Sequence, residues 1–301
     1  MATNSPLRAA LSRNVRYPLE ALAIRGLFGF LSLLPADSAS DLGGWVGRTL
    51  GPRLKANRRV QRNLEQAMPE LDAAGRARVG RESWDTLGRI MAEYAHFKTI
   101  SAEWEDRVDF VGAEHLAGLR DDGKPGIVLT GHFGNWEMAG LASHKMDLLI
   151  TIIYRAPNNP WVDRLLLRAR SDLGNSLVPK GRSAAKTILA TVRGGGHLGV
   201  LADQKLNEGI PVPFLGRDAM TGTITADMVL RHGAVVVPVK VTRPGKGARF
   251  RIEAMPPLTF APTGDRAADI YAITLQINQV FETWVREDPG QWLWTHRRWP
   301  K

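Results

Sequence analysis

The sequence of 301 residues contains no cysteine. This absence excludes disulfide bonds, thiolate metal sites and a cysteine nucleophile, and it is compatible with a reducing cytoplasm. The sequence also has no repeat of fixed period, no low-complexity tract and no linker long enough to separate a second independent domain. With 44% hydrophobic and 23% charged residues, it has the composition of a globular protein with a sizeable core.

Long apolar runs are missing as well, although the N-terminal region is apolar. Arg25 interrupts the stretch Ala21–Pro35 and leaves only Gly26–Leu34 without charge, whereas a helix that spans a bilayer needs about 20 residues. We interpret the stretch as a retained helix that lies in a membrane interface, with Trp45 in the same belt. A buried core helix is the alternative, and a secretory signal fits poorly because Glu20 and Arg25 interrupt it. The basic residues before the stretch are Arg8, Arg13 and Arg16.

Basic residues outnumber acidic ones and give a formal net charge of +10. Up to Arg62 the sequence contains ten Lys or Arg against three Asp or Glu, which is a local balance of +7. Such a field favours anionic partners, which include nucleic acid, anionic lipid and an acidic carrier protein. The charge alone does not choose among these partners.

The spacing of apolar residues divides the chain into two parts. From Ser5 to about Thr99 they recur every three or four residues, which predicts helices, so residues 1–100 are interpreted as a helical, membrane-facing part. In residues 101–301, strand-like segments alternate with helical patterns, which predicts an α/β domain with a mostly parallel central sheet flanked by helices. The strand-like segments are Val108–Gly112, Gly126–Thr130, Leu148–Tyr154, Ser176–Pro179, Leu198–Ala202 and Ala234–Val241.

Three later segments have other patterns. Ala248–Ala254 alternates polar and apolar residues, which predicts an edge strand or a late antiparallel strand. Arg266–Glu287 is predicted to be a long helix, and Lys205–Thr223 is interpreted as a loop.

The C-terminal tail interleaves aromatic and basic side chains. Such a segment suits a nucleic-acid stack, a membrane interface or packing against the sheet. No RNA-binding or helix-turn-helix signature accompanies it, and we expect no nucleic-acid partner. Tryptophans at period two usually bury one face of a strand, so core packing is an equally open interpretation. The residues concerned are Trp292, Trp294, Arg297, Arg298 and Trp299.

His132 lies at the tip of the most distinctive local pattern. The apolar strand ends at Thr130, two glycines bracket His132 and Phe133, and a helix is expected to begin near Asn135, which can cap it. In an open α/β sheet, ligands bind beyond the carboxyl ends of the strands, where amides of the next helix can receive an oxyanion. His132 is therefore the candidate catalytic base. The alternative is a turn histidine that is bonded to local backbone.

Glu137 lies five residues further on, in the first turn of the expected helix. Its carboxylate could hold one imidazole nitrogen and stabilise the imidazolium ion. No serine, threonine or cysteine stands at the tip, so the pair predicts a base for an external nucleophile rather than part of a triad. The alternative is a charge that only complements the helix dipole.

Further polar candidates lie at the ends of other elements. Arg168 and Arg170 end the helix predicted over Asn159–Arg170 and could bind a phosphate or polarise a carbonyl. Asp203 and Gln204 end an apolar strand where a sheet forms its crevice, and they are candidate substrate-binding residues. The alternatives are solvated cations at a helix C-terminus and an aspartate that caps a turn.

Taken together, these segments resemble the lipid A biosynthesis lauroyl/myristoyl acyltransferase family, within the glycerophosphate-acyltransferase-like group that has the motif His-x-x-x-x-Asp/Glu. The resemblance covers nearly the whole chain. In many relatives a proline precedes the Asp-Gln pair where this chain has Ala202, so the shape of that turn departs from the pattern. The segments that carry the resemblance are Gly131–Glu137, Tyr154–Pro160 with Arg170, Leu201–Gln204, Val212–Gly216 before Thr221, and Trp292–Trp299.

The resemblance implies an O-acyltransferase at the cytoplasmic face of the inner membrane. It implies transfer of a fatty acyl chain from the thioester of acyl carrier protein to a hydroxyl of a Kdo-bearing lipid A precursor. His132 is implied as the base and Glu137 as its partner, with Arg170 and Asp203 as further active-site residues and with no metal or cofactor. The acidic carrier, the anionic glycolipid acceptor and the membrane surface all match the net charge of +10.

Two other functions remain open at this point. The phosphatidylinositol mannoside acyltransferases share the same motifs, so the acceptor could be that glycolipid. A non-catalytic protein that binds anionic lipid is the rival from another class. For the enzyme, we expect direct attack by the hydroxyl, with the oxyanion met by amides of Gly134–Trp136 and by Arg170.

Overall fold

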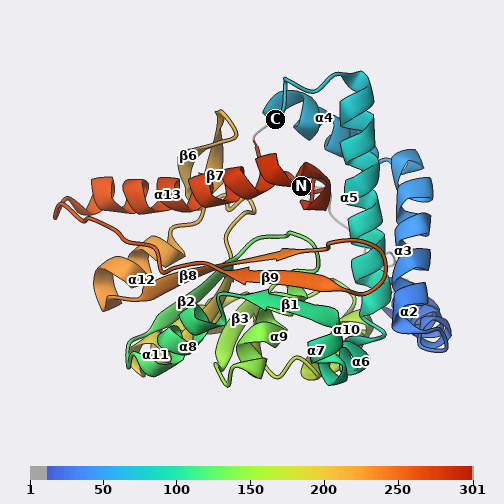
Figure 1. The fold of residues 1–301 in the computed structure, drawn as a ribbon, viewed down its shortest axis with the longest axis horizontal. Coiled ribbons are helices and arrows are strands. Elements are labelled where there is room, and N and C mark those ends of the chain that lie inside the picture. The colour runs from blue at the N-terminus through green and yellow to red at the C-terminus, as the bar shows by residue number, and fades with distance from the viewer. Residues whose placement is uncertain (1–11, 300–301) are drawn as a thin grey trace.

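The computed structural model describes residues 12–299 of the chain. The expectations placed on Arg8 and on a helical start at Ser5 lie outside the described residues. Helices account for the N-terminal part up to the first strand, as predicted (Figure 1). They are η1 Ser12–Arg16, α2 Tyr17–Leu31, α3 Ala36–Leu50, η2 Gly51–Arg53, α4 Asn57–Ala67, α5 Ala73–Glu93, α6 Phe97–Ala102 and α7 Trp104–Arg107.

The remainder of the described chain is built around a seven-stranded sheet with the order β1-β9-β8-β2-β5-β3-β4 (Figure 1). All neighbouring strands are parallel except β8 and β9, which confirms the predicted mostly parallel α/β fold. The strands are β1 Val108–Val111, β2 Gly126–Thr130, β3 Ile150–Tyr154, β4 Ser176–Pro179, β5 His197–Leu201, β8 Val235–Thr242 and β9 Phe250–Ala254. The helices are α8 Ala113–Asp121, α9 Glu137–Lys145, α10 Pro160–Ser171, α11 Arg182–Arg193, α12 Ile224–His232 and α13 Arg266–Glu287.

Three predictions about the later segments need correction. β9 is antiparallel to β8, as one interpretation predicted, but it is not an edge strand because β1 pairs with its other side. The expected loop Lys205–Thr223 contains an antiparallel hairpin of β6 Ile210–Phe214 and β7 Arg217–Thr221. The C-terminal tail is not a strand: after the 3₁₀ turn η3 Pro289–Gln291 it makes one isolated bridge, between Phe133 and Trp292.

The sheet separates two hydrophobic layers because side chains alternate along each strand. On β2, Ile127 and Leu129 belong to the layer that contains Phe281 and Trp284 of α13. Val128 points to the opposite layer, which contains Met138 of α9. Every residue of β2 is buried, as expected for a central parallel strand covered on both faces. Helices α4 and α5 contribute Val60, Leu64 and Val79 to the first layer, so the helical part shares its core with the sheet.

Helices α3 and α5 pack with their backbones in close contact. A Cβ atom at Gly47 would lie 2.1 Å from the carbonyl oxygen of Trp84, and one at Gly88 would lie 2.1 Å from that of Gly43. Only glycine fits at such positions, because any side chain would push the helices apart. This contact fixes α3 on α5, which also packs against the C-terminal segment through Ser83 and Thr86.

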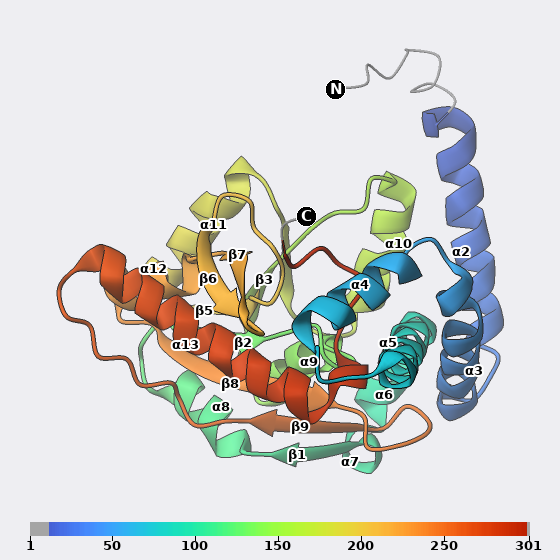
Figure 2. The same ribbon diagram turned by 90° about the horizontal axis from the view of Figure 1, so that it is seen from above.

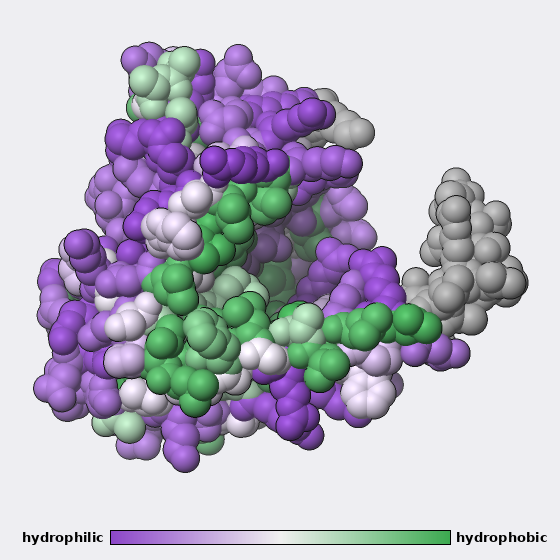
Figure 3. All heavy atoms as spheres, turned by 90° about the vertical axis from the view of Figure 1, so that its right-hand side faces the viewer, coloured by the Kyte–Doolittle hydropathy of each residue, from purple (hydrophilic) through white to green (hydrophobic). Residues whose placement is uncertain are grey.

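Helix α2 projects from the body of the molecule (Figure 2) and exposes much of its apolar surface. Apolar side chains form a band on the face seen in Figure 3, and the band borders a hollow in the surface. No helix in the described part of the chain is long and apolar enough to cross a membrane. The large exposed apolar residues of α2 are Leu19, Leu22, Leu27 and Phe30.

Candidate active site

His132 and Asp203 meet because β2 and β5 are adjacent parallel strands that end level with each other. Thr130 of β2 is paired with Leu201 of β5, so the chain leaves both strands at the same edge of the sheet. The Nδ1 atom of His132 lies 2.7 Å from Oδ1 of Asp203, and the backbone N–H of His132 donates to Oδ2 at 2.8 Å. The crevice rule that selected both residues from the sequence therefore places them in direct contact.

The carboxylate of Asp203 is buried, with 0% of its side chain exposed. The indole N–H of Trp292 donates to Oδ2 at 2.8 Å, in addition to the two contacts from His132. Burial would raise the pKa of Asp203, but the neighbouring His132 and its N–H groups lower it more, so the pKa lies well below its usual range. Asp203 is therefore ionised and acts only as an acceptor.

An ionised Asp203 fixes the tautomer of the neutral His132 ring. Nδ1 carries the proton that it donates to the carboxylate, so Nε2 holds the free lone pair. The side-chain amide nitrogen of Gln204 lies 2.9 Å from this Nε2 atom and donates to it. The Gln204 side chain is exposed, so Nε2 is directed toward the open side of the site.

Glu137 does not contact His132, which corrects the expectation that it is the partner of the base. Its carboxylate accepts three hydrogen bonds from the guanidinium of Arg170, at 2.5 and 3.0 Å on Oε1 and at 3.1 Å on Oε2, and one from Tyr94 at 2.6 Å. Arg170 also donates to the Tyr94 hydroxyl at 2.8 Å. Helix α9 begins at Glu137, Tyr94 directly follows the end of α5, and Arg170 lies near the end of α10.

Glu137, Arg170 and Tyr94 form a second polar cluster, which is mostly buried. Burial would lower the pKa of Arg170, but Glu137 and Tyr94 raise it above its usual range. Burial and the charge of Glu137 raise the pKa of Tyr94 well above its usual value. The charges of Glu137 and Arg170 neutralise each other, so the cluster stabilises the packing of the start of α9 beside α10. Tyr94 was missed from the sequence because nothing in its helical context marks it.

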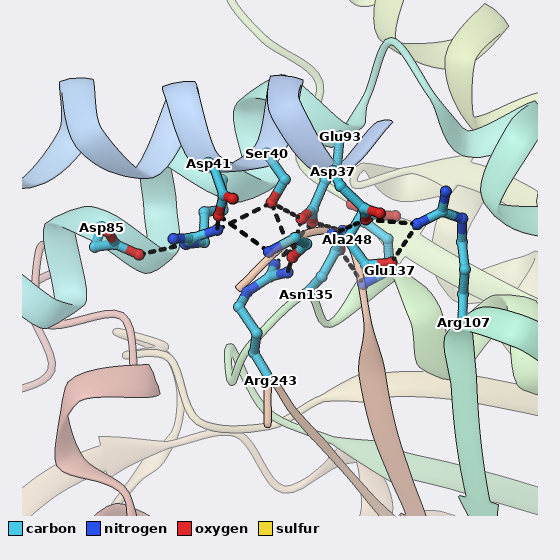
Figure 4. Close-up of polar contacts among 12 residues, drawn as sticks. Asp37, Ser40, Asp41, Asp85, Glu93, Arg107, Asn135, Glu137, Arg243 and Ala248 are labelled. Carbon is cyan, nitrogen blue, oxygen red and sulfur yellow. Dashed lines mark hydrogen bonds and ion pairs between the residues drawn. The ribbon is translucent and has the colours of Figure 1, made fainter. Parts of the chain in front are cut away.

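Asn135 connects the two clusters through the turn between β2 and α9. Its side-chain oxygen accepts the backbone N–H of Glu137 at 3.2 Å, so it supports the helix start as predicted, although α9 begins two residues after it. Its amide nitrogen donates to the buried Glu93 at 2.8 Å. Glu93 also accepts from Ser40 of α3 and pairs with Arg243 of the β8–β9 loop (Figure 4). The turn that carries His132 is therefore attached to the helical part of the molecule.

The C-terminal tail closes the site from the other side. Trp292, Trp294 and Trp299 are buried and in mutual ring contact, so packing is the interpretation that the structure confirms for these residues. The ring of His296 lies 6.1 Å from that of His132, and burial lowers its pKa to about 4, which keeps it neutral near pH 7.

Arg298 holds the Asp-Gln turn from the tail. Its guanidinium donates to the backbone carbonyls of Gln204 and Met220 and to the side chains of Thr221 and Asn278. Burial lowers the pKa of Arg298 to about 10. The sequence singled out this residue as a basic tail residue, but it is a structural cation of the interior.

Two other expectations about the site need correction. The side chain of Arg168 is exposed and contacts none of the site residues that the structure describes, so the fold brings Arg170 to the site without it. The amide of Gly134 donates to the carbonyl of Gln291 at 3.0 Å and is not free to receive an oxyanion. The amides of Asn135 and Trp136 have no acceptor within the described part of the chain.

Comparisons with known proteins identify the class to which this fold and site belong. A family model for bacterial lipid A biosynthesis acyltransferases matches residues 8–301. The chain therefore belongs to the bacterial lipid A biosynthesis acyltransferase family, as the sequence motifs indicated.

Individual relatives cover most of this chain and of their own length. The lipid A biosynthesis lauroyltransferase of Escherichia coli K12 is 26% identical, over 98% of this chain and 96% of its own. A lipid A biosynthesis acyltransferase of Haemophilus influenzae is 23% identical, over 88% of this chain and 82% of its own. A phosphatidylinositol mannoside acyltransferase of Mycobacterium tuberculosis is 22% identical, over 92% of this chain and 85% of its own.

Proposed function

We propose that this acyltransferase moves a fatty acyl chain from acyl carrier protein to a hydroxyl of a Kdo-bearing lipid A precursor at the cytoplasmic face of the inner membrane. The observation that carries the proposal is the His132–Asp203 pair, in which Nε2 of the imidazole is directed toward the open side of the site. The lauroyltransferase among the relatives supports a lipid A acceptor. The net charge of +10 suits an acidic carrier and an anionic acceptor.

In the proposed mechanism His132 is the general base. The acceptor hydroxyl replaces the Gln204 amide at Nε2 and transfers its proton there while its oxygen attacks the thioester carbonyl. Asp203 stabilises the imidazolium that forms, as a buried carboxylate does in hydrolase triads. When the tetrahedral intermediate collapses, the C–S bond breaks and the imidazolium returns the proton to the thiolate of the carrier. No acyl-enzyme is formed.

The oxyanion of the tetrahedral intermediate needs hydrogen-bond donors near His132. The amides of Asn135 and Trp136 are available at the start of α9, where the helix dipole also favours negative charge. Arg170 is held by Glu137 and Tyr94, so we assign it a positioning role in place of direct contact with the oxyanion. Gln204 keeps the substrate-binding role expected from the sequence, because it adjoins the base and is exposed.

The test is an acyl transfer assay with purified protein, carrier protein charged with radiolabelled laurate, and a Kdo-bearing lipid A precursor. We expect labelled product from this acceptor and little from a phosphatidylinositol mannoside run in parallel. The His132→Ala variant should lose about 10²–10⁴-fold in kcat, the range ascribed to a positioned base. His115→Ala, on α8 outside the site, serves as the control and should retain full turnover.

Three results would contradict parts of the proposal. Near wild-type turnover by His132→Ala would show that His132 is not the base. A covalently labelled protein would show that the reaction passes through an acyl-enzyme and not through direct attack. A higher rate with the phosphatidylinositol mannoside would show that this glycolipid is the acceptor. A protein that turns over neither acceptor but binds anionic lipid after loss of His132 would be the non-catalytic binder.

A further inference from the structure

A groove with basic walls lies on the outer side of α4 and the turn that precedes it. It has a volume of about 450 Å³ and is lined by residues between Pro52 and Glu65. Its walls carry four exposed cations, with Arg58 and Arg62 one helical turn apart on the same face of α4. The four cations are Arg53, Lys55, Arg58 and Arg62.

These four cations have no ion pair within the described residues, in contrast to neighbouring arginines. On the adjacent helices, Arg48 pairs with Asp85, Arg78 pairs with Glu82, and Arg89 pairs with both Asp41 and Asp85. These carboxylates are engaged by other arginines. Among the described residues, Glu65 is the only acidic one that lines the groove. The groove therefore presents a net positive charge that the chain itself does not neutralise.

The inner side of α4 lies directly against the site. The amide of Asn63 donates to the carbonyls of Trp294 and His296 at 2.9 Å each, and Arg59 donates to the carbonyl of Thr295. The ring of His296 lies 6.1 Å from that of His132. Figures 1 and 2 both show α4 beside the C-terminal end of the chain. Only the tail separates the helix that bears the groove from the candidate base.

We propose that this groove is the docking surface for the acidic carrier protein that brings the thioester. The inference rests on the proposed function, in which a carrier protein is the acyl donor. An acidic protein fits better than a membrane, because an interfacial helix exposes large apolar side chains opposite its cations. The exposed residues of α4 are charged or polar, and Leu54 is the one large apolar side chain exposed on the groove. The exposed apolar residues of the N-terminal part lie mainly on α2 and α3.

The test compares two donors with the double variant Arg58→Glu/Arg62→Glu. One donor is lauroyl acyl carrier protein, and the other is lauroyl-pantetheine, which carries the same thioester without charge or protein. We expect KM for the carrier donor to rise at least tenfold, with kcat for lauroyl-pantetheine within twofold of wild type. KM of the wild type for the carrier donor should also rise with ionic strength, and this dependence should weaken in the variant.

The control is Lys124→Glu/Lys145→Glu, which makes the same change in charge at the opposite edge of the sheet, before β2 and β3. It should leave both donors unaffected. An unchanged KM for the carrier donor in the α4 variant, or an equal loss with both donors, would overturn the docking proposal. Loss of binding to anionic vesicles with an unchanged KM for the carrier would assign the groove to the membrane instead. If the wild type transfers from neither donor, the proposed function itself fails.

Discussion

At the residue scale, the main question about the site is which carboxylate accepts the hydrogen bond of the His132 ring. The motif suggests Glu137, because it is close in sequence and lies in the first turn of a helix. The fold selects Asp203, which is distant in sequence but follows the neighbouring strand. Glu137 has stronger partners in Arg170 and Tyr94. The closeness of Glu137 to His132 is visible in the sequence. The closeness of Asp203 to His132 follows only from the order of the strands in the sheet.

This assignment predicts different effects for two matched amide substitutions. In Asp203→Asn, the amide can no longer hold the Nδ1–H tautomer, so kcat should fall by about 10⁴, as it does for the analogous change in a hydrolase triad. In Glu137→Gln, Arg170 and Tyr94 keep their partner position and the imidazole is untouched, so kcat should fall by less than about tenfold. Steady-state kinetics of the two purified variants provides the measurement.

The ratio of the two effects decides the assignment. Circular dichroism and thermal unfolding serve as controls that both variants are folded. If folded Glu137→Gln loses as much kcat as Asp203→Asn, the His132–Asp203 pair is not the arrangement that functions during the reaction. A comparable and small loss in both variants would mean that neither carboxylate orients the base.

At the scale of elements, the sequence predicts those whose pattern is local. The apolar run Gly126–Thr130 and the long amphipathic segment Arg266–Glu287 coincide with β2 and α13, because burial on one or both faces leaves a periodic mark. The prolines of Ile210–Phe214 argue against a strand, so the sequence pattern predicts a loop where the β6–β7 hairpin lies. The alternating pattern of β9 does not reveal that β1 covers its other side, because this pairing joins segments more than 130 residues apart.

The tail shows how a correct residue pattern can indicate the wrong element. Trp292 and Trp294 are buried, as period-two tryptophans suggest, but the segment is irregular and its polar atoms bind distant residues. The candidate site shows the same division. The sequence identified His132, Asp203 and Gln204 from strand ends, whereas it gave no sign of Tyr94 or Glu93, which act through long-range contacts.

The buried network around Glu93 predicts how these elements are held together. Glu93 is fully buried and contacts Ser40, Asn135 and Arg243, so it joins α3, α5, the β2–α9 turn and the β8–β9 loop (Figure 4). Glu93→Gln would leave Arg243 buried without its counter-charge, which should lower the free energy of unfolding by about 3–5 kcal/mol. Urea unfolding followed by circular dichroism measures this change.

Glu82→Gln is the matched control on the same helix. Glu82 pairs with Arg78 at the surface, where both side chains are about half exposed, and such pairs contribute about 0–1 kcal/mol. A loss in Glu93→Gln no larger than that in Glu82→Gln would show that the network does not hold the helical part to the turn that carries His132.

At the scale of the whole molecule, apolar and basic surfaces are separated. The apolar band lies on α2 and α3, and the four cations of the groove lie on α4 and on the segment that precedes it. Between α2 and the start of α10 lies a second groove of about 520 Å³, lined by residues that include Tyr17, Ile24 and Val162. An amphiphilic acceptor needs a site that is open to a membrane on one side and to the donor on the other. The first groove adjoins the C-terminal tail through Asn63 of α4, and the second adjoins α10, the helix that carries Arg170.

This arrangement predicts that the exposed apolar face of α2 anchors the enzyme to membranes, whereas the opposite face, with Ala21 and Leu31, is buried in the fold. In Leu22→Glu/Phe30→Glu, two side chains that are 66% and 53% exposed become charged, so stability should change by less than about 0.5 kcal/mol per site. Burying each apolar side chain in a membrane would contribute about 1.5–3 kcal/mol, and each 1.4 kcal/mol corresponds to tenfold. Binding to vesicles of anionic lipid, measured by sedimentation, should therefore fall at least about 100-fold.

Charge repulsion alone could weaken vesicle binding, so the control must add the same charge elsewhere. Val111→Glu/Leu149→Glu introduces two carboxylates at exposed apolar positions outside the α2–α3 band and should leave vesicle binding nearly unchanged. Transfer to an acceptor dispersed in detergent should persist in both double variants, because neither alters His132 or Asp203. Equal vesicle binding by the two variants would mean that the apolar band of α2 is not the membrane contact. Loss of transfer in detergent would mean that α2 shapes the acceptor site itself.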